Sequence, residues 1–243
     1  MQSPAPILAF LCTCWENEGC MNKQESARQI LVRLKRRYRR TGPFVSFRNP
    51  LELVVATMLS AQCTDVQVNK VTKKLFKKYR TARDYAMAPL KTLEKEIYST
   101  GFYHSKARYL KGIGRMLMRR FEGRVPANFN DLVALPGIST KSANLIMAKA
   151  FNKPTGIAVD THVLRVAPRL GLTKEKNPHR MGKDLERLFE PRDYLSVNEY
   201  FITHGRATCK PKPRCPSCVL KDICPSAKMF IRRYYSGGKA GPS

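Results

Sequence analysis

Two groups of residues in the sequence have types and spacing that could support chemistry, and the first is a lysine with an aspartate. An unprotonated lysine attacks electrophilic carbon and can form a Schiff base, while a nearby carboxylate stabilises a developing cation or assists proton transfer. Lys141 and Asp160 form such a pair if the helices that begin there face one cleft. Each also has a simpler interpretation, because Lys141 could be a solvated lysine and Asp160 only a helix cap.

The second group is a loop of four cysteines near the C-terminus. Their spacing is Cys-x5-Cys-x2-Cys-x5-Cys, formed by Cys209, Cys215, Cys218 and Cys224. In a reducing compartment, thiols this close together favour a metal site over disulfides. Zinc sites commonly join two cysteine pairs across a longer stretch, whereas one Cys-x2-Cys flanked closely on both sides suits an iron–sulfur cluster at least as well. Spacing alone leaves iron and zinc open.

Lys141 follows a short turn between two predicted helices. An apolar pattern at 129–135 leads into Pro-Gly at 136–137, and a second apolar segment starts at Ser142, which together predict a helix-hairpin-helix near 129–148. Glycine readily adopts the positive φ that such a turn needs. The first N–H groups of the second helix have no intrahelical partner and suit a phosphate oxygen.

The charge of the chain points to a polyanionic partner. Lys and Arg total 45 against 18 Asp and Glu, a formal net charge of +27 over 243 residues. Such a field attracts nucleic acid, and a ribosomal-type structural role also stays open at this point. A membrane is the alternative, but no stretch reaches the roughly 20 apolar residues of a span. The apolar run 7–15 lacks the preceding positive charge of a signal peptide, which predicts an intracellular protein.

The elements that must position these residues are predicted to be helices. Apolar side chains recur at helical spacing and two-residue alternation is nearly absent, which indicates an all-α protein of about ten short helices. The predicted helices are 24–40, 51–60, 66–78, 89–99, 106–121, 129–135, 142–150, 161–170, 178–189 and 194–204. Ser105 is the expected cap of one helix, and Gly112 and Gly114 are expected to weaken it.

Three polar residues have less specific signals. Gln62 lies in a polar corner after the apolar helix 51–60, at the mouth between two helices, where it could simply be a loop hydrogen bonder. His162 and His204 are single histidines on helices, and we expect them to serve in hydrogen bonding rather than as ligands or bases.

Taken together, these segments resemble the endonuclease III family of DNA glycosylases. The resemblance rests on Leu-Pro-Gly-Ile-Ser-Thr-Lys-Ser-Ala at 135–143, Val-Asp-Thr-His-Val at 159–163, Leu-Ser-Ala-Gln-Cys-Thr-Asp at 59–65, His-Gly-Arg at 204–206 and the cysteine loop. It covers about residues 22–226. In two places the chain departs from the family: Ser139 stands where the hairpin usually has a second glycine, and five residues instead of six separate the first two cysteines.

The resemblance implies an all-α helix-hairpin-helix glycosylase fold. A six-helix barrel domain and an iron–sulfur cluster domain would lie on either side of a DNA cleft. The expected divisions are a disordered N-terminal tail at 1–21, an N-terminal helix of the cluster domain at 22–42, the barrel domain at 43–156, the C-terminal part of the cluster domain at 157–226 and a basic C-terminal tail at 227–243.

The activity that the resemblance implies is that of a bifunctional DNA glycosylase and abasic-site lyase. It would remove oxidised or reduced pyrimidines in base excision repair, with Lys141 as the Schiff-base nucleophile, Asp160 assisting, and β-elimination following. Gln62 would fill the gap left by the extruded nucleotide. The hairpin residues that would grip the DNA backbone are Gly137, Ile138, Ser139 and Thr140, and the ligands that would bind a [4Fe–4S] cluster are Cys209, Cys215, Cys218 and Cys224.

The expected partner is double-stranded DNA with a damaged pyrimidine or an abasic site, bound by a monomer away from membranes. The expected location is the cytoplasm or nucleoid, or the nucleus or mitochondrion of a eukaryote. One alternative is a monofunctional mismatch glycosylase of the same superfamily, although branches without lyase activity generally lack a lysine at position 141. The other is a non-enzymatic DNA-binding module that carries a cluster or zinc.

Overall fold

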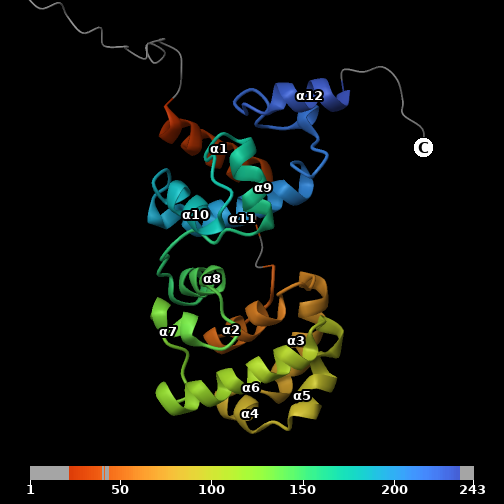
Figure 1. The fold of residues 1–243 in the computed structure, drawn as a ribbon, viewed down its shortest axis with the longest axis vertical. Coiled ribbons are helices and arrows are strands. Elements are labelled where there is room, and N and C mark those ends of the chain that lie inside the picture. The colour runs from red at the N-terminus through yellow and green to blue at the C-terminus, as the bar shows by residue number, and fades with distance from the viewer. Residues whose placement is uncertain (1–21, 40, 42–43, 236–243) are drawn as a thin grey trace, which may run out of the picture.

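The computed structural model describes residues 22–39, 41 and 44–235, and within them the fold is helical (Figure 1). The α-helices of this part are α1 Lys23–Tyr38, α2 Pro50–Leu59, α3 Asp65–Lys78, α4 Ala82–Met87, α5 Leu90–Ile97, α6 Tyr103–Arg120, α7 Phe129–Ala134, α8 Thr140–Phe151, α9 Thr161–Arg169, α10 Pro178–Glu186, α11 Tyr194–Ala207 and α12 Ala227–Tyr235. Short 3-10 turns lie at Tyr98–Thr100, Pro191–Asp193 and Cys215–Ser217. No strand occurs in the described ranges, which confirms the predicted all-α class.

The buried hydrophobic side chains form two clusters, and the helices that contribute to them form two tiers, one above the other in Figure 1. The lower cluster belongs to α2–α8, from Val45 to Met147. The upper cluster joins α1 to α9, α10, α11 and Leu220. The first helix of the described chain therefore packs against the C-terminal third, and the segment between α8 and α9 connects the two tiers.

Helix α2 is buried along nearly its whole length, as its apolar sequence predicts. The Asn49 side chain caps its start by accepting from Glu52 N at 2.9 Å. Its end is held by a buried cation, because Lys106 Nζ donates to the carbonyl oxygens of Leu59 and Thr100 at 2.8 Å each. Burial lowers the pKa of Lys106. Helix α2 is thus a fixed support for the corner that follows it.

The region of α4 and α6 differs from the sequence prediction. Helix α6 begins at Tyr103, after Phe102 in the left-handed region at φ 50°, so Ser105 is not its cap. Gly114 does not interrupt the helix: a Cβ there would lie 2.6 Å from Ala82 O, so glycine lets α4 cross α6 closely. Six residues are too few for α4 to show a helical period, but Thr81 and Asp84 form a capping box that signals its start.

The C-terminal part also differs from expectation. Residues 227–235 form α12, so the prediction of a tail from residue 227 is wrong for this segment. The helix is held by Phe230, whose ring lies 4.7 Å from the Arg169 guanidinium carbon, and by Tyr235, whose hydroxyl donates to Pro213 O at 2.9 Å. The expected tails at 1–21 and 236–243 lie outside the described residues. None of the described helices is both long and apolar enough to cross a membrane.

Candidate active site and cysteine cavity

The hairpin between α7 and α8 has the geometry that its sequence predicts. Gly137 adopts φ 76°, and a Cβ there would come within 2.7 Å of the Tyr109 ring, so this position requires glycine. Ser139 lies in extended backbone at φ −83° and caps α8, because its side chain accepts from Ser142 N at 3.2 Å. The position that usually carries a second glycine therefore needs none here.

The four candidate backbone-binding residues of the hairpin are not equivalent. Gly137, Ser139 and Thr140 are exposed. Ile138 is buried, and its N–H donates to Leu135 O at 3.1 Å. Ile138 thus holds the turn together, and the exposed residues on either side of it are free to meet a phosphate.

Lys141 lies on the first turn of α8 and lines a cleft of about 1270 Å³, counting the part open to solvent. The cleft is walled by the end of α2, the starts of α8 and α9, and α11. The Lys141 side chain is exposed and has no hydrogen bond or ion pair within the described part of the chain. Its amine is therefore available to a ligand.

Asp160 lines the same cleft, and it is the N-cap of α9 as predicted. Its Oδ1 accepts from the backbone N–H groups of His162 and Val163 at 3.0 and 2.9 Å. Its Oδ2 has no hydrogen-bond partner among residues 22–39, 41 and 44–235. One oxygen fixes the carboxylate while the other stays unused, so capping alone does not occupy the group.

A residue that the sequence analysis missed, Arg165, supports the start of α9. It donates to His162 Nδ1 at 2.9 Å, to Gly205 O at 3.1 Å and to Cys209 O at 3.0 Å. A guanidinium can only donate, so His162 Nδ1 accepts and its proton lies on Nε2. Burial lowers the pKa of His162, which serves in hydrogen bonding as predicted.

Two ion pairs, also missed by the sequence analysis, join the tiers at the cleft. Lys149 on α8 contacts Glu199 on α11 at 2.7 Å, and both side chains are largely buried. Arg206 on α11 contacts Asp65 at the start of α3 at 2.7 Å, and its guanidinium carbon lies 4.7 Å from the Phe44 ring centroid. These contacts hold the two walls of the cleft to each other. Sequence separation hides them, because neither pair is local.

Gln62 lies in the turn between α2 and α3, as predicted. It is exposed and adopts φ 52°, which is uncommon for a residue other than glycine. Its neighbours Ala61 and Cys63 line the cleft. The turn therefore presents Gln62 at the edge of the cleft that contains Lys141.

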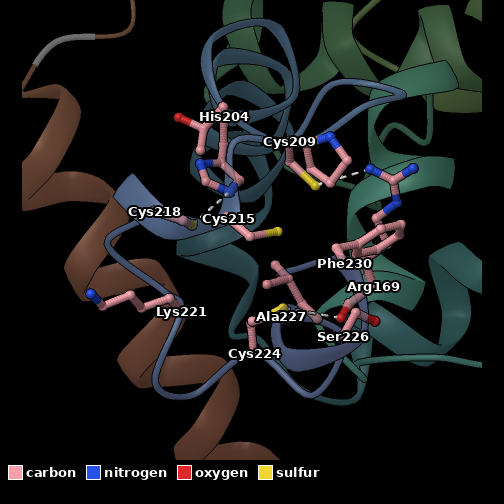
Figure 2. A pocket seen from close by; sticks show the side chains of 13 residues that line it. Arg169, His204, Cys209, Cys215, Cys218, Lys221, Cys224, Ser226, Ala227 and Phe230 are labelled. Carbon is pink, nitrogen blue, oxygen red and sulfur yellow. Dashed lines mark hydrogen bonds between the residues drawn. The ribbon is translucent and has the colours of Figure 1, made fainter. Parts of the chain in front are cut away.

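The four loop cysteines line one cavity of about 350 Å³, counting its open part (Figure 2). All four are free thiols, and they enter the cavity from different sides. The short first gap is closed by a backbone hydrogen bond from Arg214 N to Thr208 O at 3.0 Å. The five-residue spacing therefore still brings Cys209 and Cys215 to the same cavity.

The surroundings of the thiols disfavour their ionisation. Burial, with the charges of neighbouring cysteines, raises the pKa of Cys215 and of Cys218, and raises that of Cys224 to about 11. Four thiolates here would need a positively charged group among them, which fits the donor set of an iron–sulfur cluster. In the described part of the chain, no three His, Cys, Asp or Glu side chains are arranged to hold a single metal ion.

The sequence of this chain is similar to those of known DNA repair proteins. The sequence profile of the HhH-GPD superfamily of base excision DNA repair proteins matches residues 55–191. Endonuclease III of Synechocystis sp. is 42% identical over 208 residues, which span 85% of this chain and 95% of the relative. Endonuclease III of Bacillus subtilis is 43% identical over 178 residues, which span 72% of this chain and 81% of the relative.

Solved structures extend the similarity to three dimensions. The structure of a non-covalent endonuclease III–DNA complex superposes with a TM-score of 0.82 at 40% identity, covering 88% of this chain and 100% of that one. A trapped endonuclease III–DNA covalent intermediate gives the same TM-score, identity and coverage. A thermostable thymine-DNA glycosylase at 24% identity, with a TM-score of 0.76, shares the fold.

Proposed function

Because the chain belongs to the endonuclease III family of the HhH-GPD superfamily, we propose that Lys141 is the nucleophile of its reaction. The protein is a bifunctional DNA glycosylase and abasic-site lyase of base excision repair. The position of Lys141 supports its role most directly, because its side chain is exposed in the cleft that Asp160 also lines and has no hydrogen bond or ion pair with another described residue. The simpler interpretation of a solvated lysine does not account for that shared cleft.

In the proposed reaction, the Lys141 amine forms a bond to C1′ of the damaged nucleotide. The glycosidic bond breaks, and the base leaves with the electron pair and takes up a proton. The C1′–O4′ bond of the sugar ring then breaks, with a proton lost from the nitrogen and one taken up by O4′, which gives an imine. The imine allows loss of a proton from C2′ and β-elimination of the 3′ phosphate, which cuts the strand. Asp160 would stabilise the cationic sugar or accept the proton of the attacking amine, through the oxygen that does not accept from the backbone of α9.

We propose that the hairpin and Gln62 bind the DNA. The exposed backbone of Gly137, Ser139 and Thr140 would donate to phosphate oxygens, and Ile138 would fix the turn. A base inside the duplex is out of reach, so the target nucleotide must leave the stack. Gln62, at the edge of the cleft, would fill the space that it leaves. The net charge of +27 supplies backbone affinity without sequence selection.

We propose a [4Fe–4S] cluster as the resident group of the cysteine cavity, held by Cys209, Cys215, Cys218 and Cys224. The four thiols enter the cavity from several sides, so each cysteine would hold one of the four irons of the cluster. When bound, the cluster would crosslink the loop to itself and offset part of the negative charge of the four thiolates. Iron and sulfide analysis with a visible absorbance band would support it, and a zinc content without sulfide would contradict it.

Four further proposals concern the substrate class, the oligomeric state, the location and the domains. We propose oxidised and reduced pyrimidines as the substrates, a monomer as the active form, and an intracellular location where DNA is found. The two hydrophobic clusters would correspond to a barrel domain at 43–156 and a cluster domain formed by 22–42 and 157–226. A glycosylase panel over oxidised, reduced and mismatched pyrimidines tests the substrate class directly.

Borohydride trapping on an abasic duplex tests the central proposal. The wild type should give a covalent protein–DNA adduct that is absent from Lys141→Ala. Absence of the adduct in the wild type would contradict the assignment and favour the monofunctional alternative. If the protein also left every damaged or mismatched pyrimidine in place, the non-enzymatic DNA-binding module would be favoured.

A further inference from the structure

One titratable residue of the cysteine cavity has no part in the proposed chemistry. His204 lies on α11, is 1% exposed and lines the cavity beside Cys218 (Figure 2). Its Nε2 is 3.8 Å from Cys218 Sγ, and its Nδ1 is 2.9 Å from Tyr38 Oη. The imidazole therefore connects a cysteine of the loop to the last residue of α1.

Tyr38 has a second partner on α11. Its hydroxyl lies 3.1 Å from Thr208 Oγ1, and its ring meets the His204 ring edge to face, with centroids 6.0 Å apart. Burial raises the pKa of Tyr38, so the hydroxyl keeps its proton. The backbone N–H groups of Thr208 and Cys209 both donate to His204 O at 2.8 Å. The Tyr38 hydroxyl is thus held between the side chains of His204 and Thr208, and the backbone of Thr208 is held to that of His204.

The chemistry of the partners sets the direction of these hydrogen bonds. A cysteine that binds a metal is a thiolate, which can only accept, so Nε2 of His204 must donate to Cys218. The imidazole is buried, and its Nδ1 lies 2.9 Å from a hydroxyl that carries its own proton, so Nδ1 accepts from the Tyr38 hydroxyl. The Tyr38 oxygen then accepts from the Thr208 hydroxyl.

We propose that Thr208, Tyr38 and His204 form a hydrogen-bond chain of fixed direction that donates to the Cys218 sulfur and raises the reduction potential of the cluster. The proposal rests on the proposed cofactor. A hydrogen bond to a ligand sulfur withdraws negative charge and stabilises the more reduced state. Tyr38 and His204 are positioning residues in this scheme, because neither binds the metal.

The effect is specific to one corner of the cavity. Cys218 Sγ also accepts from Leu220 N at 3.4 Å, and Cys209 Sγ accepts from Arg169 Nη1 at 3.5 Å. Cys215 Sγ has no donor in the part of the chain that the structure describes. Cys218 therefore has two hydrogen-bond donors, His204 and the backbone N–H of Leu220. Of these two donors, only the His204 side chain can be removed by a substitution without altering the backbone.

Potentiometric titration of the purified holoprotein tests the proposal. His204→Phe should lower the reduction potential of the cluster, Tyr38→Phe should lower it less, and Thr208→Val least. His204→Gln, which restores an N–H near the Nε2 position, should recover part of the shift. A potential unchanged in both His204→Phe and Tyr38→Phe, at wild-type iron content, would overturn the proposal.

The histidine tautomer gives a second, independent readout. Nitrogen NMR of the wild type should show His204 with its proton on Nε2 and a bare Nδ1, and Tyr38→Phe should change the Nδ1 resonance. A proton on Nδ1 would overturn the chain even if the potentials shifted. The iron and sulfide content of the wild type tests the proposed cofactor separately from the hydrogen-bond chain. If no cluster is present, the proposed cofactor and the effect on its potential are both wrong. The tautomer of His204 still decides the direction of the hydrogen-bond chain in that case.

Discussion

The cleft and the cysteine cavity are built in opposite ways, although the same helices α9 and α11 contribute to both. In the cavity, the sulfur atoms of Cys209 and Cys218 already have hydrogen-bond donors within the protein, Arg169 and His204. In the cleft, Lys141 and one oxygen of Asp160 have no hydrogen-bond partner among the described residues. A site whose polar atoms have partners within the protein fits a permanently bound group. A site whose polar atoms lack such partners fits a ligand that binds and dissociates, and for this reason we call the cleft that contains Lys141 the open cleft.

Arg165 is the point at which the two regions meet. Its guanidinium holds the backbone of Cys209 on one side and His162, near Asp160, on the other. Gly205 makes this possible, because a Cβ there would lie 2.9 Å from His162 Nδ1. The cavity can thus act as a fixed support for one wall of the cleft.

The largest expected effect is on the strand-cleavage rate, and it comes from removing the Lys141 amine from the open cleft. Lys141→Ala should lower the strand-cleavage rate on an abasic duplex by about 10³-fold or more, because the nucleophile is lost. The free energy of unfolding should stay unchanged, since the side chain is exposed. Lys153→Ala, an exposed lysine just past α8, is the matched control. A lyase rate that fell equally in both variants would point to lost charge instead of a lost nucleophile.

Asp160 separates catalysis from capping. Asp160→Asn keeps a good cap but removes the charge, so it should cost about 10²-fold or more in glycosylase rate with little change in stability. Asp160→Ala should have the same catalytic loss and also cost about 1 kcal/mol of unfolding free energy. Single-turnover kinetics and urea unfolding measure the two. Full activity in Asp160→Asn would reduce the residue to a cap.

Lys149 sharpens the comparison, because it lines the open cleft yet is buried and paired. Lys149→Met leaves Glu199 as an uncompensated buried charge and should cost about 3–5 kcal/mol of unfolding free energy. The double variant Lys149→Met with Glu199→Gln should recover much of that loss. Urea unfolding of both proteins is the measurement. A double variant no more stable than the single one would contradict the pairing.

The smallest effect lies outside the cavity, where Arg33 on α1 contacts Asp222 at 2.6 Å. The side chains are 35% and 57% exposed, so Arg33→Met should cost only about 0.5 kcal/mol, and less in high salt. The Arg33 hydrogen bond lowers the pKa of Asp222. This contribution is therefore present above the pKa of an unfolded aspartate, about 4, and is lost as the pH falls through the lower folded value. Urea unfolding across that range measures it.

The sequence predicts the parts of the molecule whose causes are local. Gly137 in the turn and Asp160 as an N-cap depend on a few adjacent residues, and both are found as predicted. The long apolar face of α2 is local in the same sense. The all-α class follows from the same short-range periodicity.

The parts that the sequence did not predict depend on residues far apart in the chain. Arg165, Lys149 and Arg206 carry no local signal, because their partners lie on other helices. Gly114 shows the same limit: local propensity counts it as a weak point, but the helix that crosses there makes it a requirement. Ser139 is a different case, because serine is a favoured N-cap and the sequence around it is enough to predict that role. The sequence analysis considered this position only as a missing second glycine.

The return of α1 to the C-terminal third has a consequence for how the chain folds during synthesis. Helices α2–α8 are contiguous, so the lower tier can form as soon as residue 151 is clear of the ribosome. Arg33 must wait for Asp222, 189 residues later, which at usual translation speeds is roughly 10–40 s. The apolar face of α1 packs against α9, α10 and α11, so it has no partner until those helices have been made, and the first helix of the described chain is among the last to be buried.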